Sequence, residues 1–392
     1  MASVDQMISS LRAIDASSLS VDDRLRLLDE VRGTLRRVQS PWDIAWDHAW
    51  VHGATMAAIT SLINASLFTK WAEAGNKPMT TPELAELIGV DASLLKRLLR
   101  QVAGDNLVGE VGEDTYAPTP WSTRLGTESS FASIYKSFYY DIVLPLWKSL
   151  PSFFKKAGYD NPTELTNSNF QYTHGEGSTF FSYVASREET NQAFADAMGC
   201  HSEGNFTSWV DLYDTDEMVQ ASKPDRALIV DIGGSKGHDI EKFLQKHPDV
   251  PKDKLILQDL PEVLAKFTIH PGITPYPYDF FTPQPIKGAR AYYYHIVLHD
   301  WPDVTATKIL ETVRDAMEPG YSRILLHEVL VPENKASLTV ATLDVTMMAL
   351  FSALERSEKQ WYQLIDGVEG LRIVKIWKAR HAVESLIEIE RV

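Results

Sequence analysis

Five polar residues that could take part in chemistry each follow a short apolar run in the second half of the chain. Apolar runs of this length are typical of strands buried in a parallel sheet. The carboxyl ends of such strands meet at one edge, where α/β proteins bind ligands. Carboxylates there can accept hydrogen bonds from hydroxyl groups, and an imidazole can move protons near neutral pH. The five residues are Asp231, Asp259, Asp279, His299 and Glu328.

The stretch 227–259 has the pattern of a strand, a glycine-containing turn, a helix and a second strand that ends at Asp259. Glycines within residues 233–237 allow a tight turn and the close approach of a ligand. A carboxylate after the second strand suits the two hydroxyls of a ribose. The sequence therefore predicts a nucleoside-containing cofactor, although an ordinary strand–turn–helix with an exposed Asp231 would show the same pattern.

The glycine loop narrows the choice of cofactor. Neither the dinucleotide fingerprint G-x-G-x-x-G nor the phosphate loop G-x-x-x-x-G-K-[ST] fits residues 233–237. The acidic Asp231 at the mouth of the loop would repel a pyrophosphate. It favours a cofactor that carries an ammonium and a sulfonium group, and S-adenosylmethionine is such a cofactor.

Composition limits the class of protein. The chain has 392 residues, 44% of them hydrophobic, which supports a sizeable core and two domains. The net charge of −15 argues against nucleic acid or an anionic membrane surface as a partner. The single Cys200 excludes disulfides within the chain and favours a cytoplasmic location. We expect it to be a buried inert thiol rather than a pocket thiol, and we find no signal-peptide core or membrane-spanning run.

The N-terminal part is predicted to be mainly helical. Residues 1–39 have the spacing of one or two amphipathic helices, and 57–71 that of one apolar helix. Trp42, Trp46 and Trp50 are four residues apart, so they share one helical face that we expect to meet a partner surface.

Residues 81–117 have the pattern of a winged helix. A helix with Pro near its start is expected over 81–89, a second helix capped by Asp91 over 93–102, and wing strands at 107–108 and 115–117. Basic residues on the second helix would suit DNA. The wing and the whole chain are acidic, however, so a role in packing and dimerisation is favoured.

The following segment, 131–210, is rich in aromatic residues and is predicted to be mostly helical. A polar link over 211–224 leads from it into the α/β unit. We expect most of the aromatic side chains to lie in the core and some of them to line an apolar pocket. The expected pocket residues are Tyr135, Lys136, Tyr139, Phe181, Met198, His201, Met347, Met348 and Phe351.

The remaining elements continue the α/β pattern to the end of the chain. The expected strands cover 227–231, 254–258, 274–278, 289–298, 323–327, 371–377 and 384–390. The expected helices cover 239–246, 260–269, 305–317 and 343–354.

Five motifs in this order carry a resemblance to a known family. They are Asp231-Ile232-Gly233-Gly234-x-x-Gly237-His238, Gln258-Asp259-Leu260-Pro261, Asp279-Phe280-Phe281, His299-Asp300-Trp301-Pro302-Asp303 and Glu355-Arg356-Ser357-Glu358. Over nearly its full length the chain resembles class I S-adenosylmethionine-dependent O-methyltransferases of the plant caffeate/flavonoid type, and most of all their fungal secondary-metabolism branch. The resemblance implies a mainly α winged-helix dimerisation domain (1–125), a helical pocket segment (126–210) and a Rossmann-like domain with a mostly parallel seven-stranded sheet (211–392). It also implies a homodimer that acts on a small molecule.

The resemblance implies a role for each matching residue. His299 is the implied general base that removes the proton of a substrate hydroxyl, with Glu328 and Glu355 orienting its ring and Asp300 beside it. No metal is needed, because methyl transfer is mostly a matter of positioning. Without the resemblance, His299 could equally be a turn histidine that faces solvent. The implied cofactor contacts are Asp231, Gly233 and Gly234 at the methionine end, Asp259 at the ribose, and Asp279 and Phe280 at the adenine. Two more are implied without a stated part of the cofactor: Leu260, and His295, where relatives often carry Arg or Lys.

Two other functions stay open. Some fungal members of this family keep the fold and the cofactor but catalyse dehydration or pericyclic ring closure without moving a methyl group. The acid/base residues His299, Glu328 and Glu355 favour methyl transfer. The second alternative is a non-catalytic winged-helix regulator, which the acidic charge disfavours.

Overall fold

The computed structural model describes residues 3–175, 177–204, 208–378 and 383–392. It divides into two compact units, each with its own buried core. The first unit consists of Met1–Ile142 with Glu189–Glu203, and the second of Val143–Glu188 with Gly204–Val392.

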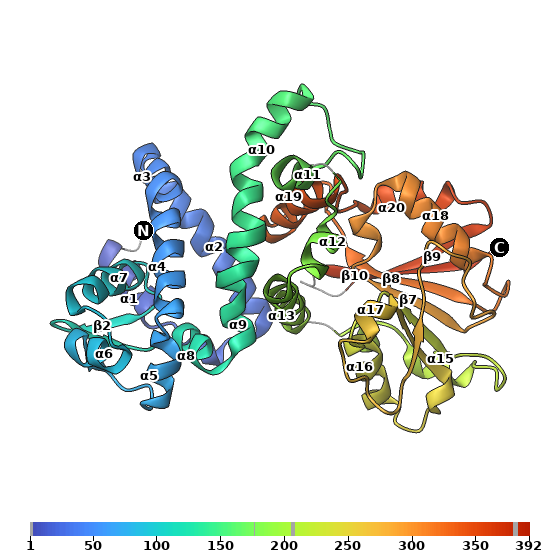
Figure 1. Ribbon diagram of the computed structural model, residues 1–392, viewed down its shortest axis with the longest axis horizontal. Helices are drawn as coiled ribbons and strands as arrows, with labels where there is room; N and C mark the ends of the chain where they lie inside the picture. Colours follow the sequence, from blue (N-terminus) through green and yellow to red (C-terminus); the bar gives the residue numbers. More distant parts are fainter. Residues whose placement is uncertain (1–2, 176, 205–207, 379–382) are drawn as a thin grey trace. The chain divides into compact units, whose positions relative to one another are not determined.

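A seven-stranded sheet forms the centre of the second unit (Figure 1). The spatial order is β6-β5-β4-β7-β8-β10-β9, in which β4 to β8 run parallel and β10 is antiparallel to both of its neighbours. The predicted, mostly parallel seven-stranded sheet is therefore confirmed. The strands are β4 (Ile229–Ile232), β5 (Leu255–Asp259), β6 (Thr274–Pro277), β7 (Ala291–His295), β8 (Arg323–Val329), β9 (Leu371–Lys378) and β10 (Glu384–Arg391).

The direction in which strands are added reverses between β4 and β7. The chain first builds outward from β4 through β5 to β6, and then begins again with β7 on the other side of β4. The carboxyl ends of two strands at such a reversal flank a crevice, which is where doubly wound sheets bind ligands. Asp231 in β4 and His295 at the end of β7 lie at this edge.

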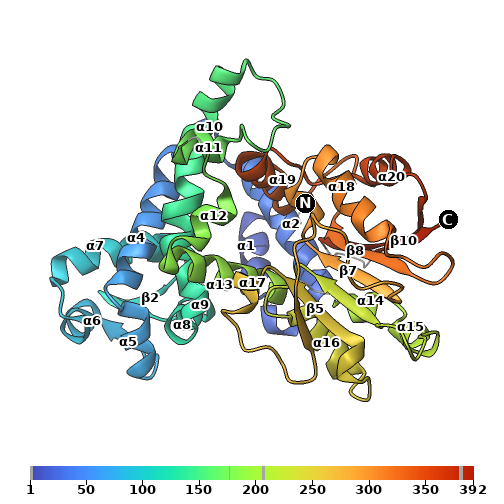
Figure 2. The same cartoon turned by 45° about the vertical axis from the view of Figure 1, so that its right-hand side comes forward.

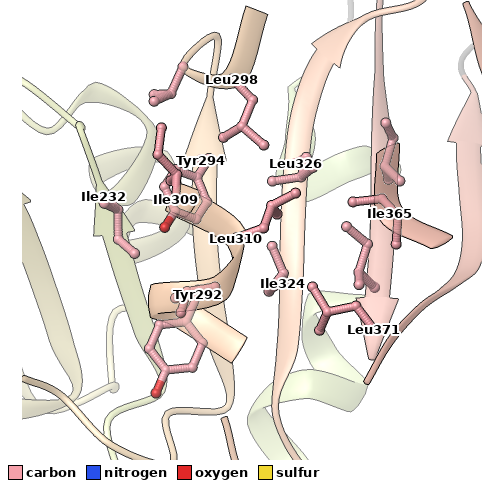
Figure 3. Close-up of a cluster of buried hydrophobic side chains, with 14 of the residues drawn as sticks. Ile232, Tyr292, Tyr294, Leu298, Ile309, Leu310, Ile324, Leu326, Ile365 and Leu371 are labelled. Atoms are coloured by element: carbon pink, nitrogen blue, oxygen red, sulfur yellow. The ribbon is translucent and has the colours of Figure 1, made fainter. Parts of the chain in front are cut away.

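Helices cover both faces of this sheet (Figure 1, Figure 2). On one face, α18 (Asp303–Arg314) and α20 (Glu358–Asp366) cover the core drawn in Figure 3. On the other face, α14 (Trp209–Leu212) and α16 (His238–Lys246) cover a second core that contains Tyr293. Successive strand residues point to opposite faces. The other helices of this unit are α10 (Leu144–Ala157), α11 (Asn169–His174), α12 (Phe180–Ala185), α15 (Thr215–Gln220), α17 (Pro261–Leu264) and α19 (Leu338–Phe351).

Two predicted elements of the second unit were too long. The strand expected over 289–298 ends at His295, because Ile296 turns with a φ of +50° and Leu298–Asp300 form a 3₁₀ turn. The helix expected over 260–269 ends at Leu264, beyond which the backbone bonds join residues three apart. The expected polar link over 211–224 also differs, since it includes α15.

The first unit is mainly helical. The apolar helix expected over 57–71 is in fact two helices, α4 (His52–Asn64) and α5 (Leu67–Glu73), because Ser66 adopts a left-handed φ of +59°. Two capped helices, α6 (Thr81–Ile88) and α7 (Ala92–Gly104), precede a β2–β3 hairpin. The wing strand expected at 107–108 was misplaced, since the strand begins at Gly109, after the turn that follows α7. The remaining elements are α1 (Val4–Arg12), α2 (Val21–Val38), α3 (Pro41–Trp46), β1 (Met79–Thr80), β2 (Gly109–Gly112), β3 (Thr115–Ala117), α8 (Pro120–Thr127), α9 (Ser129–Ser133) and α13 (Glu188–Gly204).

Among the described residues, no single helix is both long and apolar enough to cross a membrane. The pair Pro41–Asn64 and Leu67–Glu73, bent by 53°, passes the same test only when taken together. Apolar side chains of this pair, including Leu62, Phe68 and Trp71, fill the core of the first unit.

Candidate active site

A sharp corner after β7 positions His299. Ile296 has a φ of +50° there, a conformation that is rare and costly for a β-branched residue. The Glu328 carboxylate stabilises the corner, because its Oε1 accepts the backbone N–H groups of Val297 at 3.1 Å and Leu298 at 2.8 Å. In this structure Glu328 therefore holds the backbone that leads to His299, while another acid contacts the ring.

That acid is Glu355, which follows α19. Its Oε1 lies 2.8 Å from His299 Nδ1, and both side chains are buried. Asp300 Oδ1 lies 3.4 Å from the other ring nitrogen, Nε2. A carboxylate on Nδ1 fixes the ring orientation and keeps the proton there, which leaves Nε2 as the nitrogen that exchanges protons with a ligand.

The charges around His299 control its protonation. Burial alone would lower the pKa of His299, but the negative charges of Asp300 and Glu355 outweigh it and raise this pKa to about 10. Burial also raises the pKa of Asp300 to about 7. These carboxylates favour the protonated imidazole, and positive charge entering the site would lower the pKa of His299.

Arg356 fixes the same turn from the other side. This fully buried guanidinium donates to the carbonyl oxygens of Leu298 at 3.0 Å and Trp301 at 2.7 Å, and to Asp303 Oδ1 at 2.8 Å. Its neighbour Glu355 is thereby tied to the turn that carries His299. Arg356 belongs to one of the five family motifs, but the sequence predicted no role for it; its position directly after Glu355 was the available signal.

The methionine end of the predicted cofactor site is a glycine cradle beside a buried acid. Asp231 is buried, and its Oδ2 has no hydrogen-bond partner among the described residues. A Cβ on Gly234 would lie 2.6 Å from that oxygen and 2.5 Å from Leu257 Cδ1, so only glycine fits there. Burial, reinforced by the charge of Asp239, raises the pKa of Asp231 well above its usual range. A buried acid without a partner suits a cationic ligand that donates N–H groups.

The second predicted acid, Asp259, is held across the same loop. Its Oδ2 accepts the backbone N–H of Ser235 at 2.8 Å, and its Oδ1 accepts that of Leu260 at 2.7 Å. Each carboxylate oxygen has a second lone pair, so the group can still accept from two hydroxyls. The half-exposed Leu260 follows it directly.

The predicted adenine contacts lie beside the glycine loop. A Cβ on Gly233 would lie 4.0 Å from Phe280 Cε1, so this ring borders the cradle. Asp279 Oδ1 accepts the N–H of Phe281 at 3.0 Å, which holds the loop after β6. The orphaned Asp231 oxygen, the glycine cradle and these flanking groups together fit S-adenosylmethionine.

His295 is arranged differently from the other predicted cofactor residues. Its Nδ1 lies 2.6 Å from Asp239 Oδ2 and its Nε2 lies 3.1 Å from Glu384 Oε2. Both ring nitrogens therefore bond to carboxylates, and the ring stacks on His327 at 4.5 Å. The sequence did not predict Asp239, His327 and Glu384 as partners of His295, because the register of β7, β8 and β10 and the packing of α16 on the sheet bring them together.

The predicted pocket residues fall into both units. In the second unit, Phe351 of α19 stacks on Phe181 of α12 with 5.4 Å between ring centroids. Met347 is buried and Met348 half-buried on the same helix, which gives this unit an apolar aromatic wall. The other five predicted residues belong to the first unit: Tyr135, Lys136, Tyr139, Met198 and His201.

Within the first unit, Tyr135 is held by its neighbours. Its hydroxyl accepts a hydrogen bond from Trp121 Nε1 at 3.1 Å, and its carbonyl accepts one from Thr60. The next residue, Lys136, interrupts the helix with φ −100° and ψ −114°. Burial raises the pKa of Tyr139.

A glycine cradle, buried acids and a carboxylate-bound histidine at the switch point of a doubly wound sheet define an α/β enzyme with a nucleoside cofactor. The chain belongs to the O-methyltransferase family, whose domain matches residues 154–370. The O-methyltransferase mfmE of Annulohypoxylon moriforme is 35% identical over 385 residues, which cover 98% of this chain and 95% of that protein. The resemblance seen in the motifs is thereby confirmed, with the fold, the enzyme class and the cofactor that it implied.

Solved structures show the same fold. OxaC in complex with SAH and oxaline is 27% identical, with a TM-score of 0.83 over 99% of this chain and 98% of that one. A protein described as a pericyclic reaction enzyme is 23% identical, with a TM-score of 0.87 over 98% of each chain. The second likeness concerns the fold alone.

Proposed function

We propose that this chain is an S-adenosylmethionine-dependent O-methyltransferase that acts on a phenolic or enolic hydroxyl of a secondary metabolite, with His299 as the general base. The buried contact of 2.8 Å between His299 Nδ1 and Glu355 Oε1 carries the proposal. It leaves Nε2 to meet the substrate. Family membership and the likeness to OxaC, which was solved with SAH and oxaline, support the choice of substrate class.

In the proposed reaction, the residues of this chain bind, orient and move one proton. The cofactor, when bound, supplies a methyl group activated on a sulfonium. Asp231 and the loop 233–237 hold its methionine end, Asp259 its ribose, and Phe280 with Asp279 its adenine. His299 Nε2 takes the proton of the hydroxyl, and Glu355 stabilises the imidazolium that results. The apolar wall of Phe181 and Phe351 suits a flat substrate.

A second function uses the same site without methyl transfer: a pericyclase or dehydratase that depends on the cofactor's positive charge. The pKa of about 10 for His299 favours it, because a protonated imidazole donates a hydrogen bond rather than accepting a proton. The cofactor is bound in both functions, and its positive charge is expected to lower this pKa. An imidazole that becomes neutral in the cofactor complex would favour methyl transfer, whereas one that stays protonated there would favour the second function.

The decisive experiment is incubation of the purified chain with methyl-labelled S-adenosylmethionine and candidate phenols, followed by mass spectrometry. Labelled product that rises in step with S-adenosylhomocysteine is the expected result. A precursor that loses water or isomerises while the cofactor stays intact would instead favour the second function.

We also propose that two copies of the chain associate through their N-terminal helices. None of the residues of α1, α2 and α3 is buried, although each helix has an apolar face. The Trp42, Trp46 and Trp50 rings pack on one another and remain about half exposed. An exposed apolar surface of this extent is typical of an interface, and a second copy of the same surface is its proposed partner.

A further inference from the structure

A buried cluster of two histidines and a glutamate lies on one face of the sheet and takes no part in the proposed reaction. His295 ends β7 and pairs in register with His327 of β8. His327 in turn pairs with Leu386 of β10, two residues after Glu384. Residues two apart on a strand share a face, so three neighbouring strands present these three side chains in one row.

Each imidazole has its Nδ1 held from outside the row. His295 Nδ1 lies 2.6 Å from Asp239 Oδ2, and His327 Nδ1 lies 3.0 Å from the Tyr293 hydroxyl. His295 Nε2 bonds to Glu384 Oε2 at 3.1 Å, and His327 Nε2 lies 3.5 Å from the same oxygen. An acid or hydroxyl on one ring nitrogen, with the other directed at a common point, is the usual arrangement around histidines that bind metals.

The distances suit a small metal ion. Glu384 Oε2 lies 3.1 Å from His295 Nε2 and 3.5 Å from His327 Nε2, and all three atoms lie within 4.8 Å of one another. Ligand atoms about 2.0–2.1 Å from a tetrahedral zinc ion are about 3.3 Å apart. Two of the separations bracket that value. The third separation, between the two Nε2 atoms, is at most 4.8 Å. A tilt of the stacked imidazole rings, whose centroids are 4.5 Å apart, would adjust it to the same value.

The burial and the charge of the cluster also suit a bound cation. Only 1% of the Glu384 side chain and 4% of the His327 side chain are exposed. Asp239, with 12% exposed, brings a second carboxylate to the cluster, and its other oxygen, Oδ1, meets Lys242 Nζ at 3.2 Å. Buried carboxylates need a cation, and imidazole with carboxylate is a ligand set that zinc-class ions favour.

We propose that His295 Nε2, His327 Nε2 and Glu384 Oε2 form a structural binding site for one divalent transition-metal ion of the zinc class. The ion would join β7, β8 and β10 and, through Asp239, the helix α16 that follows the glycine loop. A protonated His295 between its two carboxylates would make the same contacts without a metal, and the experiment separates these cases.

The test titrates Zn²⁺ into the chelator-treated chain by calorimetry and records the absorption spectrum of the Co²⁺ form. An exposed pair, His48 and His52, stands one helical turn apart and offers a competing surface site. All variants are therefore made in a His48→Gln/His52→Gln background. We expect one ion per chain, a tetrahedral Co²⁺ spectrum and a higher Tm with Zn²⁺.

Three variants and one control assign the site. His327→Gln and Glu384→Gln remove a ligand each and should abolish stoichiometric binding. Tyr293→Phe removes only an outer partner and should weaken binding about 10–100-fold. His270→Gln, at an exposed position outside the cluster, should leave binding unchanged. Circular dichroism checks that each variant is folded. The proposal is overturned if the His48→Gln/His52→Gln protein binds no Zn²⁺, or if His327→Gln and Glu384→Gln leave Zn²⁺ binding intact.

Discussion

The protonation of His299 determines what the site can do. The carboxylates of Asp300 and Glu355 stabilise the charged form of His299. This suits a residue that receives a proton during a reaction, but it disfavours the neutral form that must be present before the reaction begins. For His299 to act as the proposed base it must first lose its proton, which a cation bound close by or a rise in pH would favour. The pH dependence of turnover therefore reports directly on its neighbours.

The His299→Ala variant should lower turnover by about two to four orders of magnitude, because a positioned general base contributes that much. Initial rates with labelled cofactor measure the effect. The matched control is His270→Ala, which removes an exposed imidazole. Turnover that stays at the parent level in His299→Ala would exclude His299 as the base.

The Glu355→Gln variant should shift the rising limb of the pH–rate profile to lower pH. The sign follows from charge: the carboxylate stabilises imidazolium, so its loss lowers the pKa of His299, by about 1–3 units. The amide oxygen can still accept from Nδ1, so the ring stays oriented. Profiles of kcat/KM from pH 6 to 10 measure the shift, with the exposed Glu333→Gln as the control. A rising limb that moves to higher pH in Glu355→Gln would contradict the stabilisation of the His299 imidazolium by Glu355.

Several individual residues could be predicted from the sequence. Asp231, Asp259, His299 and Glu328 stood out because polar residues at the carboxyl ends of strands gather at one edge of a parallel sheet, whereas Glu355 followed only from the family resemblance. Their partners could not be predicted. Glu328 bonds to the backbone of the β7 corner, and His295 meets Glu384 across 89 residues of sequence. Both contacts depend on strand register and on the local turn at Ile296.

Between the strands and the helices, short connections fix the geometry of the candidate active site. Most strands and long helices followed from the hydrophobic pattern, since their period is set by the backbone. Two of the errors fell where non-glycine residues take a positive φ that no pattern signals: at Ile296, which ends β7, and at Ser66, which divides one predicted helix into two. The turn that carries His299 is stabilised by two side chains from more distant parts of the chain, Glu328 and Arg356.

The Arg356→Lys variant should loosen this turn. A lysine keeps the charge but loses the planar fork that reaches Leu298, Trp301 and Asp303 together. We expect the free energy of unfolding to fall by about 2–3 kcal/mol. We also expect kcat to fall while cofactor affinity is kept, since the loop 233–237 is untouched. Denaturant unfolding measures the stability, calorimetry the cofactor affinity and kinetics the kcat, with the exposed Arg372→Lys as the control. An unchanged kcat would show that Arg356 does not position His299.

The Gly234→Ala variant should damage the cradle itself. Its methyl group would lie 2.6 Å from Asp231 Oδ2 and 2.5 Å from Leu257 Cδ1, and relieving such overlap costs about 1–3 kcal/mol. The displaced Asp231 should then bind the cofactor more weakly, which calorimetric titration measures. Gly53→Ala is the matched control, because a Cβ there meets nothing within 4 Å. If Gly234→Ala and Gly53→Ala bound the cofactor equally well, the methionine end of the cofactor could not lie beside Gly234 and Asp231.

At the scale of the whole molecule, the sequence predicted the order of a helical N-terminal part and a C-terminal α/β part. The net charge of −15 also agrees with a role for the helix pair α6 and α7 in packing rather than DNA binding. The tryptophan stripe was visible from its spacing of four. Its function depends on a partner surface, which no sequence of a single chain displays.

The Trp46→Glu variant should separate the proposed dimer. Trp46 lies in the middle of the stripe, 6.0 Å from Trp42 and 4.7 Å from Trp50 between ring centroids, so a carboxylate there would be buried without a partner on association. Light scattering coupled to gel filtration should give twice the chain mass for the parent protein and the single-chain mass for the variant. Val304→Glu, at an exposed apolar position on α18, is the control and should remain a dimer. A parent protein with the mass of one chain, or a variant with the parent's mass, would exclude this surface as the interface.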